Sequence, residues 1–122
     1  MEDKETKYIE VKPYDETAIT AHGAKCGGAR NLVEVPVYTE DGYAFWYLVK
    51  RPSKSVLQAI AEEKEKADKK NDASGITNIQ KLMIGCVLEG DMNAMENDGA
   101  IYTTLCKEIG RLATQAKSNL KN

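Results

Sequence analysis

The pair His22 and Cys26 is the arrangement in this chain that comes nearest to a catalytic motif. Four residues apart, the two side chains would share one face of a helix, where a histidine can activate a neighbouring thiolate as a nucleophile. His22 is the only histidine of the 122-residue chain, and no acidic residue stands at a spacing that would orient its ring. A free cysteine is usually a small, packed apolar group. We therefore predict no catalytic residues and keep a cysteine-dependent enzyme only as a third hypothesis.

A metal site would have to bring His22 together with Cys26, Cys86 and Cys106 from distant parts of the chain. Zinc sites usually take their ligands in close pairs such as Cys-x-x-Cys, which this sequence lacks. Cys86 and Cys106 also fall within apolar stripes at helical spacing, where packing in a core accounts for them. The sequence predicts no metal and no cofactor. Three widely spaced cysteines are typical of free thiols in a cytoplasm.

The composition is that of a single domain without a strong preference for one charge. Apolar residues make up 42% of the chain and charged residues 30%, with 17 basic and 19 acidic residues and a net charge of -2. This balance gives no general attraction to nucleic acid or to an anionic membrane. No run approaches the roughly 18 apolar residues of a membrane span, and the charged start Met1–Glu5 is unlike a signal peptide. We expect no membrane partner.

The first half of the chain predicts a short helix followed by a β-hairpin. Asp15 can cap the helix, which the glycines after Cys26 end. Residues 32–39 and 43–50 then form two strands around a turn that ends in glycine. Because proline has no N–H, Pro36 places the first strand at a sheet edge. The charged segment 1–14 is expected to be mobile or loosely docked, with a short strand over 8–11 as the alternative.

The second half of the chain predicts three helices. Each has a capping residue at its start and apolar residues at helical spacing. The fold class is therefore α+β, a single domain over residues 15–122 with a small antiparallel sheet. The three helices are expected from Ser53 to around 71–75, from Thr77 to Gly90, and, after a polar loop over 91–99, from Asp98 to Ala116.

The strand Tyr43–Val49 has no polar face. Its odd-numbered residues are aromatic or apolar, and its even-numbered residues are Ala44, Trp46 and Leu48. A strand with one face in water should alternate apolar and polar residues, so both faces of this one need cover. A partner protein could cover the second face, or a third strand over 8–11 and the helices could cover both within the chain. The first alternative makes the candidate partner-binding residues Tyr38, Tyr43, Phe45, Trp46, Lys50 and Arg51.

The same strand suggests a function of another class. Gly42-Tyr43-Ala44-Phe45 is close to the strand of RNA-recognition motifs whose aromatic residues stack on bases. The flanking residues depart from that motif, because Asp41 stands at the basic position and Leu48 at the last aromatic one. We keep a small single-stranded nucleic-acid-binding module using 43–49 as the alternative function.

Two stretches of the chain carry a family resemblance. One is Tyr47–Ser53, a strand that ends in Lys-Arg-Pro-Ser, and the other is Leu82–Asp91, followed by an acidic loop and Ile101–Leu105. Over roughly 15–120 the chain resembles the small tail assembly chaperones of tailed phages and prophages. The resemblance implies a non-enzymatic protein in the cytoplasm of a bacterial host. It would bind the long helical tape measure protein, and the tail tube protein, and would associate with itself as a homo-oligomer.

Overall fold

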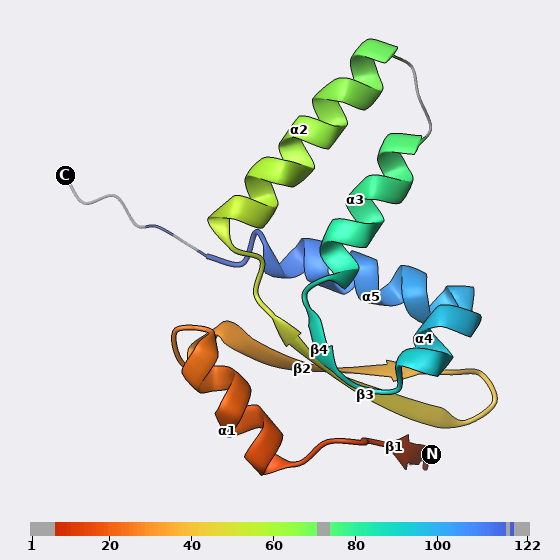
Figure 1. The fold of residues 1–122 in the computed structure, drawn as a ribbon. Helices are drawn as coiled ribbons and strands as arrows, with labels where there is room; N and C mark the ends of the chain where they lie inside the picture. The colour runs from red at the N-terminus through yellow and green to blue at the C-terminus, as the bar shows by residue number, and fades with distance from the viewer. Residues whose placement is uncertain (1–6, 71–73, 117, 119–122) are drawn as a thin grey trace.

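The computed structural model describes residues 7–70, 74–116 and 118. A four-stranded sheet lies between helix α1 on one face and helices α3, α4 and α5 on the other, and α2 packs beside α3 away from the sheet (Figure 1). The chain is therefore an α+β fold, as its sequence predicts. In chain order the elements are β1 (Ile9–Val11), α1 (Glu16–Lys25), the 3-10 turn η1 (Ala29–Asn31), β2 (Leu32–Tyr38), β3 (Tyr43–Lys50), α2 (Lys54–Lys70), α3 (Ser74–Ile84), β4 (Val87–Glu89), α4 (Met92–Asn97) and α5 (Gly99–Leu112).

The central strand of the sheet is β3. It pairs antiparallel with β2 along its whole length, in a register that places Val35 opposite Tyr47. Two short strands pair with the other edge of β3, each along a different part of it. β1 pairs in parallel with Tyr43–Phe45, and β4 pairs antiparallel with Leu48 and Val49. The sheet is thus mixed rather than purely antiparallel. In the described part of the chain, β2 is the outer strand, which confirms the edge position that Pro36 indicates.

The segment before α1 contributes the third strand that the sequence leaves as an alternative. Ile9 donates a 2.8 Å backbone hydrogen bond to the carbonyl of Gly42, and Glu10 lies opposite Ala44. Residues 9–11 are thus paired with the sheet rather than loosely docked, while residues 1–6 lie outside the described part of the chain.

Four expectations for the second half of the chain are wrong. The helix expected to reach Gly90 ends at Ile84, and Val87–Glu89 instead forms β4, which fills the edge of β3 that the short β1 leaves open. Thr77 does not cap α3, because the helix already begins at Ser74. The expected loop over 91–99 contains α4, capped by the Asp91 side chain. The last helix ends at Leu112 and not at the expected Ala116. The expected end of α2 around 71–75 falls partly on 71–73, which the structure does not describe.

The predicted helix caps at Asp15, Ser53 and Asp98 and the predicted glycine turns at the end of α1 and in the hairpin are confirmed. The carboxylates of Asp15 and Asp98 accept hydrogen bonds from the amides of Ala18 and Ala100, and the Ser53 hydroxyl accepts one from Val56. Each bond satisfies an amide that has no partner within its helix. The glycines that end α1 and close the hairpin turn have positive φ, from 80° to 118°, a conformation that glycine adopts at little cost.

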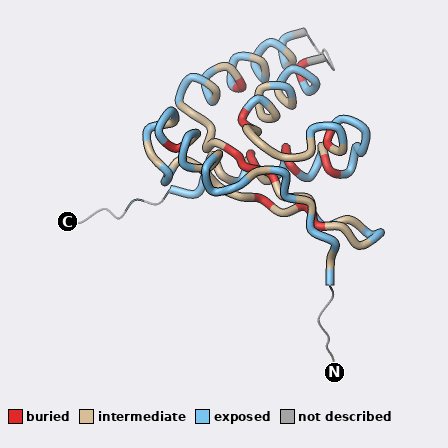
Figure 2. The backbone as a smooth tube through the Cα atoms, turned by 60° about the horizontal axis from the view of Figure 1, so that its bottom comes forward, coloured by how far each residue is buried: buried red, intermediate tan, exposed pale blue. Residues whose placement is uncertain are grey.

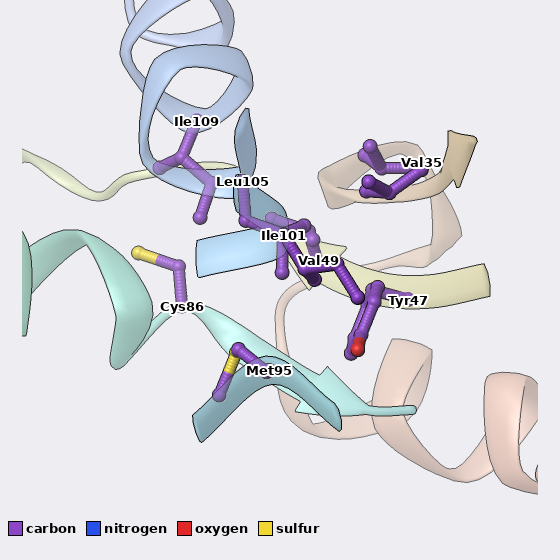
Figure 3. Close-up of a cluster of buried hydrophobic side chains, with 9 residues drawn as sticks. Val35, Tyr47, Val49, Cys86, Met95, Ile101, Leu105 and Ile109 are labelled. Atoms are coloured by element: carbon purple, nitrogen blue, oxygen red, sulfur yellow. The ribbon is translucent and has the colours of Figure 1, made fainter. Parts of the chain in front are cut away.

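The core lies between the odd-numbered face of β2 and β3 and the helices α3 to α5 (Figure 3). Tyr47 and Val49 of β3 are fully buried there against Leu105 and Ile109 of α5. The apolar stripe of α5 recurs every three or four residues, so one side of the helix meets the sheet along its length. Cys86 and Cys106 are both buried, and burial raises the pKa of each thiol, which keeps them protonated and unreactive.

The even-numbered face of the sheet is covered by α1 and the residues that lead into it. Ala44 and Leu48 are each only 1% exposed on this face, although neither belongs to the main core. Figure 2 shows the buried segments gathered along the sheet and the inward parts of the helices. Both faces of β3 are therefore covered within the chain itself. The lack of a polar face on β3 is the feature from which the sequence predicts a partner protein. The covering of both faces within the chain explains that feature without a partner protein.

Candidate functional site

The six candidate partner-binding residues do not form one surface. Tyr38, which is 56% exposed, and Trp46 lie on the face covered by α1. Tyr43 and Phe45 lie on the opposite face, where their rings stack with centroids 5.7 Å apart and Phe45 packs against the core. Lys50 and Arg51 lie at the far end of β3. Since Tyr47 is fully buried between them, the strand presents no open row of aromatic rings on which successive bases could stack.

Trp46 is tied to the N-terminal segment. Its indole Nε1 donates a 3.0 Å hydrogen bond to Glu10, and the Lys12 ammonium lies 5.3 Å from the ring centroid, within cation–π range. The Trp46 side chain thus helps to hold the segment between β1 and α1 on the sheet.

The main polar cluster of the described residues lies between the sheet and α1 with the segment that precedes it. His22 Nε2 lies 2.8 Å from Glu89 Oε2, so the histidine is oriented by an acid 67 residues away. The sequence offers no signal for this pair, because only the folding of β4 beside β3 brings Glu89 to α1. Glu89 is thus the orienting acid that the sequence spacing does not show. Among the described residues no hydrogen bond joins the side chains of His22 and Cys26, so the structure shows no contact that would activate this thiol.

A second acid on the same face makes a matching contact. Glu34 accepts hydrogen bonds from both Lys12 Nζ and the Tyr14 hydroxyl, each at 2.9 Å. The Lys12 hydrogen bond is the main reason that the pKa of Glu34 is lowered, while burial and the Glu34 contact raise the pKa of Tyr14. Both acids are engaged by groups on or before α1. The ion pairs and hydrogen bonds of this cluster therefore hold α1 and the segment before it against the sheet.

Two grooves lie on opposite sides of α5. One, of about 390 Å³, lies between α2, α3 and α5. Ile60 and Ile109 are buried in its wall, and Met83 continues the apolar lining. Leu57 is 38% exposed at this groove, and Lys64 adds a positive charge. A mostly apolar groove between helices, with one charge at its side, is the shape that receives an amphipathic helix.

The other groove, of about 450 Å³, runs along the outer edge of β2. It is lined by the residues of that strand and, across from them, by Thr104, Glu108 and Leu112 of α5 and by Arg51. The Arg51 guanidinium is held by the carbonyl of Arg30 and by Gln115. Here the sequence correctly predicts an exposed strand edge, but not the helix that runs beside it.

The chain matches no protein-family model, no curated protein and no solved structure. None of the helices within the described ranges is long and apolar enough to cross a membrane. Among the side chains that the structure describes, no three His, Cys, Asp or Glu groups are placed to hold a metal ion. The grooves on either side of α5 and the sequence resemblance therefore bear most directly on what the chain does.

The buried hydroxyl of Tyr47 makes alkaline stability a test of this packing. It donates a 2.8 Å hydrogen bond to the carbonyl of Asp91, and burial raises the pKa of Tyr47 to about 12. In the unfolded chain a tyrosine ionises near pH 10. Between these values only the unfolded state loses the proton, so the free energy of unfolding should fall as the pH rises from about 10 toward about 12.

Urea unfolding of Tyr47→Phe at pH 8 to 11.5 should show a lower stability at pH 8, by about 1 kcal/mol, because a buried carbonyl loses its donor. Above pH 10 the variant should lose less stability than the wild type. Tyr14→Phe is a second test on the other face of the sheet: because the pKa of Tyr14 is also raised, this variant too should lose less stability than the wild type above pH 10. Parallel pH profiles for wild type and Tyr47→Phe would contradict the prediction.

Proposed function

We propose that this protein is a non-enzymatic tail assembly chaperone, which binds apolar helical segments of a tape measure protein in the groove between α2, α3 and α5. The observation that carries the proposal is the groove itself, because its lining is mostly apolar and it lies between three helices. The resemblance over roughly 15–120 supplies the class of partner, a long helical protein. The tail tube protein is a second partner of the same proposal, and the cytoplasm of a bacterial host is where the assembly would take place.

The groove suits an amphipathic helix for two physical reasons. Leu57 and Ala61 stand one turn apart on α2, so their side chains line the groove in a row, as the apolar anchors of an incoming helix would. At its wall, Ile60 and Ile109 are held by the core, so the groove is preformed and does not have to open on binding.

The helix pair α2–α3 gives this groove a rigid side. Gly75 of α3 faces Ala67 of α2 so closely that a Cβ at Gly75 would overlap the Ala67 methyl group. Asn78 donates a 2.9 Å hydrogen bond to Glu63 across the same pair. A close helix contact of small residues fixes the angle of α2 to α3, and with it the width of the groove.

The test is co-expression with any long helical protein that the neighbouring genes encode. The wild-type chain should keep that protein soluble and co-purify with it. Leu57→Glu should weaken the complex by about tenfold or more, because a carboxylate would replace an apolar anchor and lose its hydration when the helix binds. Ile76→Glu is the matched control: Ile76 is also exposed, at 63%, but does not line the groove.

The outcome that contradicts the proposal is specific. Equal binding by wild type, Leu57→Glu and Ile76→Glu would remove the groove as the site. A gene neighbourhood without a long helical reading frame would remove the tape measure protein as the partner. Both variants should unfold like the wild type in urea, which separates lost binding from lost folding.

A further inference from the structure

The outer edge of β2 carries backbone groups that have no strand to pair with. At the two ends of the β2–β3 ladder, Thr39 donates a 2.9 Å hydrogen bond to the carbonyl of Tyr43 and Arg51 donates a 2.8 Å one to Asn31. Because hydrogen-bonded pairs alternate along antiparallel strands, the odd-numbered residues of β2 bond to β3. The residues whose backbone groups point outward are therefore Leu32, Glu34, Pro36 and Tyr38. Of these, Leu32 already donates its N–H to the carbonyl of Ala29, and Pro36 has no N–H.

Such an edge has a defined chemical complement, which is an extended backbone. Unpaired N–H and C=O groups in alternation form a template for another strand. Pro36 lies at one of the outward positions, so its missing N–H costs the β2–β3 ladder nothing. In the described part of the chain nothing continues the sheet beyond β2, and the groove beside α5 leaves space there.

We propose that this edge pairs antiparallel with the same edge of a second copy of the chain, about a two-fold axis at Val35. The four-stranded sheet then continues across both copies. In this register Leu32 lies opposite Tyr38 of the second copy, and the Leu32 carbonyl accepts a hydrogen bond from the N–H of that tyrosine. Glu34 lies opposite Pro36 of the second copy and donates its N–H to the proline carbonyl, so the outward N–H groups of Glu34 and Tyr38 in each copy find acceptors.

The sequence of β2 selects this register over its neighbours. With the axis at Val35, valine meets valine along the inner face, as Val33 with Val37 and Val35 with itself. Moving the axis to Glu34 would place two carboxylates directly opposite each other, which is destabilising. Moving it to Pro36 would oppose two residues that have no N–H to give. The near-palindromic order Val-x-Val-x-Val is what makes the edge complementary to itself.

This interface does not depend on the proposed function. The groove for a helix is lined by Ile109 and Gly110 of α5, whereas the β2 groove is lined by Thr104, Glu108 and Leu112 of the same helix. Both sites are therefore available at once. A dimer would carry two helix-binding grooves on one continuous sheet.

A pair of substitutions at Tyr38 tests the backbone contact. Tyr38→Pro removes an N–H that only the second copy would use, and Pro36 shows that β2 accepts proline at such a position. Tyr38→Ala removes the exposed ring but keeps the N–H. In sedimentation equilibrium the wild type and Tyr38→Ala should form dimers with similar dissociation constants. Tyr38→Pro should raise that constant roughly tenfold or more, because the dimer loses two hydrogen bonds.

A cysteine at the axis tests the register without relying on proline. Val35 would face its own counterpart in a close, non-hydrogen-bonded pair, so Val35→Cys should form a covalent dimer when diamide removes the two thiol hydrogens. Val33→Cys, which would face Val37 of the second copy, and the wild type with its three native cysteines should not.

Three results would overturn the proposal: a wild-type chain that stays monomeric at millimolar concentration, a Tyr38→Pro variant that dimerises as the wild type does, or a Val35→Cys variant that does not crosslink. If Tyr38→Pro fails to fold by circular dichroism, the crosslinking result decides. A monomeric chain that binds extended peptides at β2 would also overturn it, in favour of a different partner.

Discussion

Gly90→Ala should lower the free energy of unfolding by about 2–4 kcal/mol, a large share of the stability of a domain of this size. Gly90 follows β4 with a φ of 139°, which L residues rarely adopt. A Cβ there would overlap the ring of Tyr47 and come within 3.0 Å of the Trp46 carbonyl. Neither neighbour can yield, because Tyr47 is fully buried and the carbonyl belongs to the central strand.

The cost at Gly90 has two parts, the positive φ and the overlap of the new Cβ with Tyr47, and Gly42→Ala separates them. Gly42 also has a positive φ, 93°, but a Cβ there would meet nothing within 4 Å. It should therefore show only the backbone penalty, about 1 kcal/mol. Gly99→Ala, at a position with open space and an ordinary φ, should be close to neutral. Urea unfolding of all three variants checks the order, and a Gly90→Ala cost no greater than that of Gly42→Ala would contradict the packing of Tyr47 described here.

The sequence correctly predicts the features that depend only on residues close together in the chain. The caps at Asp15, Ser53 and Asp98 are confirmed because each requires only one side chain and an amide two or three residues ahead. The hairpin is confirmed because alternation and a glycine turn specify it within about twenty residues. The edge position of Pro36 follows from the missing N–H alone.

The errors arise where distant segments decide the outcome. Val87–Glu89 continues the apolar helical pattern before it, and it becomes a strand because β3 has an open edge there that β1 is too short to fill. The third strand Ile9–Val11 was only an alternative for the same reason: three residues have little propensity of their own. Tertiary pairing overrides local preference at both ends of this edge.

The candidate site follows the same division. The sequence predicts the residues of the hairpin but not which of its faces the helices cover. For this reason the predicted partner-binding set places Tyr38 and Trp46 together with residues on the opposite side of the sheet. The orientation of His22 by Glu89 needed the β4 pairing, which local spacing cannot show. The groove between α2, α3 and α5 was missed because it depends on the angle of α2 to α3, which the contact at Gly75 fixes.

Leu105→Ala should be among the most destabilising truncations of a single side chain in α5, at about 3–5 kcal/mol. Leu105 has no exposed surface and lies among the buried residues where α5 meets the sheet. Removing it deletes apolar contacts and leaves a cavity whose walls, Tyr47 and Val49 among them, belong to the central strand. The loss should appear in urea unfolding as a lower midpoint with little change in slope.

Leu57→Ala is the matched control, with the same chemical change at a different place. Its side chain is 38% exposed at the helix groove, so the truncation should cost less than about 1 kcal/mol of stability. The two leucines should then have opposite roles. Leu105 should be needed for folding, whereas Leu57 should be dispensable for folding but needed for binding the tape measure protein. A Leu57→Ala cost equal to that of Leu105→Ala would mean that the groove is part of the core, and that the helix-binding proposal has no open surface on which to act.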